Sequence, residues 1–240
     1  MAQHPDHAAS TPSAPPATWP VWATLVAAPM ILGLAFLPVI AWMAGLRGLR
    51  GPDLLRAVEQ VAAVPATVGF GLILLLTWRM ARRDQLSHRT LGWRRPLWTA
   101  VLVGIGCGLL IATLNQAWLY PLIQRFQPGF DPSLGDVPLI MAALMMGVAI
   151  VAEDTLYRGY ALVQLQARHG VGAAVGICSL FYALLTPGPE LALKVWALGF
   201  GLVLSALRLW TGSLWPVVLA HLIVSLGPRA ALAFTAALGA

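Results

Sequence analysis

The sequence has few charged residues and only one lysine. Charged side chains make up 10% of its 240 residues, against 59% for the hydrophobic set, and the mean hydropathy is +0.77. A soluble domain carries about 25% charged residues, because its surface must face water. This shortage of charge excludes an ordinary soluble globular domain. It predicts a chain whose surface faces a lipid bilayer.

Cysteine is also scarce, and the short motifs of several enzyme classes are missing from the sequence. Cys107 and Cys178 both lie inside apolar runs, which indicates buried packing in preference to a disulfide or a metal site. No phosphate-cradling glycine loop, nucleophile elbow or CxxC pair occurs. The formal charge of +6 comes from arginines scattered between apolar runs, so we expect membrane topology to explain it and predict no nucleic-acid partner.

Long apolar runs are what the chain has in abundance. A transmembrane helix needs about 20 apolar residues, and six or seven runs meet or approach that length. We therefore predict an all-α, polytopic transmembrane bundle of about six to eight helices, forming one domain over residues 21–240. Residues 1–20, rich in Ala, Pro, Ser and Thr, read as a disordered N-terminal tail. The expected spans are about 21–43, 57–78, 97–119, 137–153 with a polar extension to about 168, 171–186, 191–209 and 214–227, followed by a short apolar stretch at 228–240.

Tryptophan and arginine predict how the bundle sits in the membrane. Nearly every tryptophan lies near a predicted span end, as in an aromatic belt. The loop 79–96 holds six arginines against one acid, so the positive-inside rule makes it, and with it the N-terminus, cytoplasmic. Arginines in the first loop argue weakly the other way. We expect an integral protein of the plasma (inner) membrane.

Two features inside the runs bear on helix packing. Gly104/Gly108 and Gly172/Gly176 have the small-xxx-small spacing that lets helices approach closely, although glycine is also common in membrane helices generally. The Arg168-His169-Gly170 string predicts a helix stop in a short turn between helices, and not a replacement catalytic histidine.

Four ionisable residues lie inside or at the end of apolar runs, where each is costly unless it faces a partner or a wet cavity. Asp154 and Arg158 are four apart and can pair on one helix face. Glu153 points about 100° away, which leaves it free to face a cavity as a general base. Alternatively, the helix simply leaves the bilayer here and its charges are solvated. His221 could likewise be a hydrogen-bonded packing residue.

The string Glu153-Asp154-x-x-x-Arg158-Gly159 resembles the first motif, E-E-x-x-x-R, of the CAAX prenyl protease and bacteriocin-processing (CPBP, or Abi) family of intramembrane proteases. The segment 208–216, leading to His221, is similar to that family's approach to its third motif, and 91–96 is similar to its lead into a span. The resemblance covers about residues 90–226.

The other motif positions depart from the family pattern. The second motif, F-x-x-x-H, aligns with Tyr182 at the aromatic place and Thr186 at the histidine, or with Phe181 and Leu185 in the alternative register. Neither register supplies a histidine. In the third motif, H-x-x-x-N or D, Ser225 stands four residues after His221 in place of Asn or Asp.

The resemblance implies an intramembrane endopeptidase acting on a peptide or a prenylated protein near the membrane. Glu153 would activate water, with help from Thr186, Tyr182 or His221, while Asp154 and Arg158 fix the helix and His221 with Ser225 stabilises the oxyanion. A metal has also been proposed for these family positions. A zinc site needs three protein ligands, so with an incomplete set here we expect no stable metal and no other cofactor.

Two other functions stay open. The missing histidine is compatible with a catalytically inactive relative that binds a peptide or lipid as an immunity or regulatory membrane protein. Buried charge is also the usual sign of a transporter or channel. The sequence shows no internal repeat, which argues against a transporter built from inverted halves.

Overall fold

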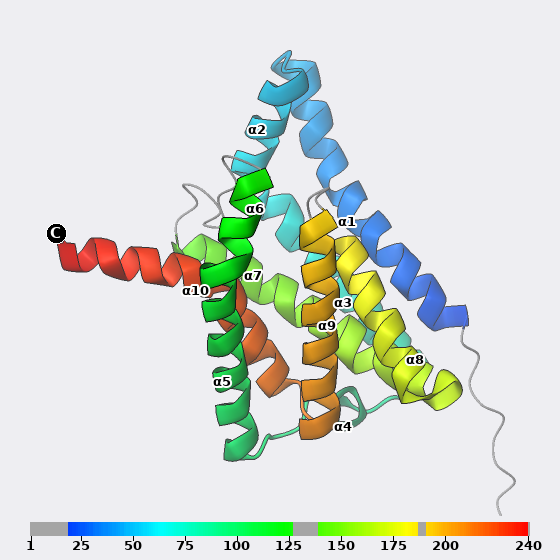
Figure 1. Ribbon diagram of the computed structural model, residues 1–240. Helices are drawn as coiled ribbons and strands as arrows, with labels where there is room; N and C mark the ends of the chain where they lie inside the picture. The colour runs from blue at the N-terminus through cyan, green and yellow to red at the C-terminus, as the bar shows by residue number, and fades with distance from the viewer. Residues whose placement is uncertain (1–18, 127–138, 187–190, 240) are drawn as a thin grey trace, which may run out of the picture.

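The computed structural model describes residues 19–126, 139–186 and 191–239, and this part of the chain is helical throughout, with no β-strand (Figure 1). Two of its segments are π-helices, η1 and η2. The elements are α1 (Trp19–Leu46), α2 (Gly51–Val61), α3 (Ala63–Arg83), α4 (His88–Leu91), α5 (Trp98–Leu114), η1 (Asn115–Leu119), α6 (Tyr120–Phe126), α7 (Leu139–Asp154), η2 (Thr155–Ala161), α8 (Leu162–Leu185), α9 (Leu191–Thr211) and α10 (Trp215–Gly239).

Within the described residues, five helical stretches are long and apolar enough to cross a membrane. At most 44% of the apolar window in any of them is buried inside the protein. Large apolar side chains such as Leu34, Leu75, Leu102 and Val195 are instead exposed on the outside of the bundle. An exposed apolar surface of this extent is stable only against lipid. The fold is therefore that of a polytopic helical membrane protein, as the composition predicted.

The longest of these stretches, Ile140–Leu185, contains two crossings. Gly170 interrupts it with φ 78° and ψ 168°, a conformation that is open essentially to glycine alone. The chain changes direction there, so that the second part of α8 packs beside α9 (Figure 1). This confirms the predicted stop at 168–170. Counting both crossings and the shorter apolar helix at 215–227 gives seven segments, within the predicted six to eight.

Two predicted boundaries need correction. The predicted span 57–78 is divided near Ala62, and the crossing helix α3 runs from Ala63 to Arg83. Proline fits the first turn of a helix, where its missing N–H costs nothing, so Pro65 allows a new helix to begin there. Helix α1 begins at Trp19 and includes Pro20, two residues that the sequence assigned to the tail. The rest of the predicted tail, 1–18, lies outside the described residues.

Helix α10 reaches its place in the bundle through a close contact with α5. A Cβ atom on Gly104 would lie 2.6 Å from the Pro216 carbonyl oxygen, and one on Gly108 would lie 2.9 Å from Ala220 Cα. The first glycine pair therefore lets two backbones approach, as its spacing predicted. Gly172 and Gly176 have nothing within 4 Å of such an atom, so the second pair does not act in this way within the described structure.

The start of α1 and the end of α3 lie on the same side of the bundle. The Arg83 guanidinium carbon lies 5.1 Å from the centre of the Trp19 ring, which places the end of α3, where the arginine-rich 79–96 loop begins, beside the first turn of α1. This agrees with the predicted topology, in which the two share one side of the membrane. That this side is cytoplasmic stays a prediction.

Candidate functional site

The candidate site is built around a buried ion pair between Asp154 and Arg158. The Arg158 Nη1 atom lies 3.1 Å from Asp154 Oδ1, and both side chains are completely buried. The spacing of four residues predicted this pair. A buried ion pair is costly to desolvate and persists only when both charges have good partners. The alternative interpretation, in which the charges are solvated where the helix leaves the bilayer, is therefore wrong for Asp154 and Arg158.

The pair spans the junction between α7 and the π-helix η2, which begins at Thr155. A π-helix widens the turn to i→i+5 hydrogen bonds; it is rare, and it frequently occurs at functional sites. Every residue of η2 is buried. Sequence reasoning missed this element, because no residue pattern distinguishes a π-turn from the α-helix around it.

Polar contacts to the α3–α4 turn hold η2 in position. The Tyr160 hydroxyl and the Gln164 amide each donate a hydrogen bond of 2.8 Å to the Asp84 carboxylate. Gly159 lies so close to the Leu91 carbonyl oxygen that an added Cβ would be 3.1 Å from it. The glycine that follows the motif arginine is thus needed for close packing.

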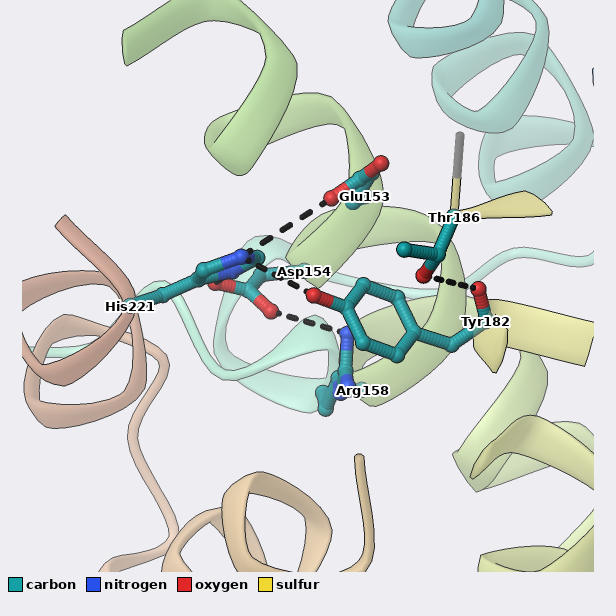
Figure 2. A network of polar contacts seen from close by, with 6 residues as sticks. All are labelled: Glu153, Asp154, Arg158, Tyr182, Thr186 and His221. Atoms are coloured by element: carbon teal, nitrogen blue, oxygen red, sulfur yellow. Dashed lines mark hydrogen bonds and ion pairs between the residues drawn. The ribbon is translucent and has the colours of Figure 1, made fainter. Parts of the chain in front are cut away.

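His221 on α10 lies between Asp154 of the ion pair and Glu153, with one ring nitrogen near each carboxylate. Its Nδ1 atom lies 3.3 Å from Asp154 Oδ2, and its Nε2 atom lies 4.0 Å from Glu153 Oε2 (Figure 2). A carboxylate beside Nδ1 favours the tautomer that carries its proton there. We infer that Nε2 is therefore the basic nitrogen of the neutral ring, and that it faces Glu153.

Aromatic side chains from two further helices enclose the histidine. Tyr182 of α8 has its hydroxyl 3.2 Å from His221 Nε2, and Phe200 of α9 meets the ring edge-on with 5.2 Å between centroids. The Arg158 guanidinium lies over the Tyr182 ring, 4.3 Å from its centre. Because Arg158 Nε and Nη2 have no hydrogen-bond partner among the described residues, this cation–π contact is a main stabilising contact of that charge.

Glu153 is the most accessible member of the cluster. Its side chain is 17% exposed, against 5% for His221 and none for Asp154. It is therefore partly accessible from outside the bundle, while the Asp154 side chain beside it is completely buried.

Thr186 and Ser225, the other two predicted site residues, lie apart from these side-chain contacts. The Thr186 hydroxyl donates to the Tyr182 carbonyl oxygen at 3.1 Å, within the end of its own helix, and its backbone carbonyl accepts from the Lys194 ammonium (Figure 2). Ser225 lies one turn after His221 on α10 and is partly buried. Among the described residues neither side chain has a hydrogen bond to a side chain of the cluster. Their catalytic roles stay predictions.

The donor set does not fit a zinc site with three protein ligands. Among the residues that the structure describes, no three His, Cys, Asp or Glu side chains are grouped so that they could hold a metal ion. Glu153 and His221 Nε2 face one space, but both Asp154 oxygens are directed to other partners. Three ligands and an open position are the usual requirement, and here only two are present.

A groove of about 820 Å³ lies beside the cluster, between η1 and α9. Phe200 belongs to both, because it lines the groove and also contacts His221. Asn115 and Trp196 join its two sides through a hydrogen bond of 2.8 Å from the indole to the amide oxygen. The remaining lining is mostly apolar, with Arg125 as its charged residue, and it includes Ile111, Leu114, Trp118, Leu122 and Val203.

Fold and site together define a helical membrane protein with an acid–histidine centre buried between α7, α8, α9 and α10. A family model described as type II CAAX prenyl endopeptidase, Rce1-like, matches residues 135–227. The match agrees with the resemblance to the CAAX protease (CPBP) family that the motifs indicated, and it covers the cluster from Glu153 to His221. It begins later in the chain than the resemblance at 90–96. No curated protein and no solved structure matches the chain.

Proposed function

We propose that this protein is an intramembrane peptidase in which Glu153 activates a water molecule to attack a peptide bond. The observation that carries the proposal is the approach of Glu153 Oε2 to His221 Nε2, at 4.0 Å, at the one accessible point of a buried cluster. A carboxylate and an imidazole side by side can accept the proton of the attacking water and pass it on. The family match to CAAX prenyl endopeptidases supports the same reaction class.

Asp154 and Arg158 have supporting roles in this proposal. Asp154 accepts from His221 Nδ1 and so fixes the ring, and it would stabilise the imidazolium that forms when Nε2 takes a proton. Arg158 balances the Asp154 charge. The reacting carboxylate is therefore Glu153, while its neighbour in the sequence holds the histidine.

We further propose that the substrate is a peptide with an apolar attachment or flank, as a prenylated C-terminus has. The apolar groove reaches the cluster at Phe200, so an apolar chain lying in it would bring an adjoining peptide bond near His221. Apolar grooves with few polar groups are typical sites for such ligands. The bilayer on the open side of the bundle would deliver such a chain.

Cleavage of labelled peptides by the protein in lipid nanodiscs tests the proposal. Two peptides of the same sequence, one with a prenylated cysteine near the C-terminus and one without, distinguish the substrate class. Glu153→Gln should reduce the rate by about 10²–10⁴-fold, while Glu59→Gln, the same change in α2, should leave it unaltered. Cleavage that survives Glu153→Gln would show the mechanism to be wrong. If the wild-type protein cleaves neither peptide, the inactive relative becomes the better description.

A further inference from the structure

Tyr182 is placed by the structure in the position of a proton carrier. Its hydroxyl lies 3.2 Å from His221 Nε2, the same nitrogen that faces Glu153 (Figure 2). Because Asp154 lies beside Nδ1, the neutral ring accepts a hydrogen bond at Nε2, and the phenol is the donor. The Nε2 atom therefore lies near both the Glu153 carboxylate and the Tyr182 hydroxyl.

The phenol ring is held firmly in this orientation. It is 6% exposed, and it packs edge-on against Tyr157 at 6.0 Å and against Phe200 at 6.3 Å between centroids. The Arg158 guanidinium covers one of its faces. A side chain fixed by packing on several sides keeps a catalytic hydroxyl within reach of its partner.

We propose that Tyr182 is the general acid of the reaction, giving its hydroxyl proton to the leaving nitrogen of the scissile amide. This inference rests on the proposed function. It explains how the chain could cleave amides without the histidine of the second family motif. Amide cleavage needs such a donor, because an amine does not leave as its anion.

The proton transfers balance as follows. Glu153 takes a proton from water, the water oxygen bonds to the carbonyl carbon, and the carbonyl oxygen becomes an oxyanion. When the carbon–nitrogen bond breaks, the oxyanion re-forms the carbonyl, the nitrogen takes the Tyr182 proton, and a free amine leaves. The protonated Glu153 then gives its proton to His221 Nε2, and Nε2 returns it to the Tyr182 oxygen. All three side chains are restored, and water has been divided between the two products.

A comparison of two leaving groups tests this role. The substrates are the labelled peptide amide and the p-nitrophenyl ester of the same peptide, whose leaving group departs without a proton. Tyr182→Phe should reduce amide cleavage by about 10²-fold or more while leaving ester cleavage within a few-fold of wild type. The ratio of the two rates does not depend on how much of the variant is folded.

Tyr157→Phe is the matched control. It removes a hydroxyl from a neighbouring buried tyrosine whose oxygen has no hydrogen-bond partner among the described residues, so both rates should stay unchanged. Equal amide cleavage by Tyr182→Phe and wild type, or a parallel loss of amide and ester cleavage, would overturn the inference. Glu153→Gln should lose both reactions. If Glu153→Gln cleaves both substrates as wild type does, the proposed function itself has failed, which is a different outcome from either result for Tyr182.

Discussion

His221 Nδ1 lies 3.3 Å from Asp154 Oδ2, although the two residues are 67 positions apart and belong to α10 and α7. The other Asp154 oxygen is paired with Arg158. One buried carboxylate therefore neutralises an arginine and orients a histidine at the same time. The second acid of the motif connects the two helices that carry the candidate base and its histidine.

This double role predicts the effect of Asp154→Asn. The substitution leaves the Arg158 charge buried without a counterion, a change that typically costs about 3–5 kcal/mol of stability. It also removes the carboxylate that selects the His221 tautomer, so cleavage should fall more than the folded fraction does. Denaturant unfolding in detergent micelles and the cleavage rate per folded molecule would measure the two effects.

Asp154→Glu is the control for that prediction, because it keeps the carboxylate and restores the residue type of the family motif. We expect it to retain most of the stability that Asp154→Asn loses. If the Asn and Glu variants unfold alike, at the wild-type denaturant concentration, then the buried carboxylate is not the counterion that holds Arg158.

The approach of α5 to α10 gives a second prediction, which concerns stability alone. Gly104→Ala places a methyl group 2.6 Å from the Pro216 carbonyl oxygen, where the neighbouring atoms are backbone and cannot easily move. The helices must then separate, at a cost of about 1–3 kcal/mol typical of overpacking. Because α10 carries His221, cleavage should fall as well. The midpoint of thermal unfolding in detergent reports the first effect.

Gly106→Ala is its matched partner, two residues along the same helix. Nothing lies within 4 Å of an added Cβ at Gly106. Alanine is favoured over glycine inside a helix by up to about 1 kcal/mol, so this variant should be unchanged or slightly more stable. Equal losses at the two positions would argue that helix propensity, and not the contact with Pro216, controls the result.

Much of the fold was predictable from the sequence because lipid imposes strict rules. Runs of apolar residues must be helical in a bilayer, so the bundle and the stop at Gly170 followed from composition and spacing. The boundaries of α1 and α3 were less well predicted, since proline fits a first turn as well as a loop.

The site was predicted in part. The pair Asp154–Arg158 follows from helical spacing alone, and the cost of burying an ionisable group singled out Glu153 and His221. The contact between Asp154 and His221 could not be predicted, because it depends on how α10 packs against α7. Tyr182 could be singled out from the sequence, because it aligns with the aromatic residue of the second family motif. The sequence named it as one of three residues that could help Glu153 to activate water, and could not assign its hydroxyl as a proton donor because the family places phenylalanine there.

That difference from the family motif leads to the last prediction. The double variant Tyr182→Phe/Thr186→His rebuilds the family pattern F-x-x-x-H at the end of α8, with the histidine at the residue that follows the helix. If the tyrosine hydroxyl performs proton transfer that the family assigns to its histidine, the added imidazole should restore amide cleavage at least about 10-fold above Tyr182→Phe alone, as a positioned acid–base group can. Thr186→Gln in the same background is the control, because it adds a polar side chain that cannot shuttle a proton at neutral pH. Equal rates for the His and Gln variants would contradict the alignment of Thr186 with the missing histidine, because the new imidazole would then be out of reach of the reacting bond.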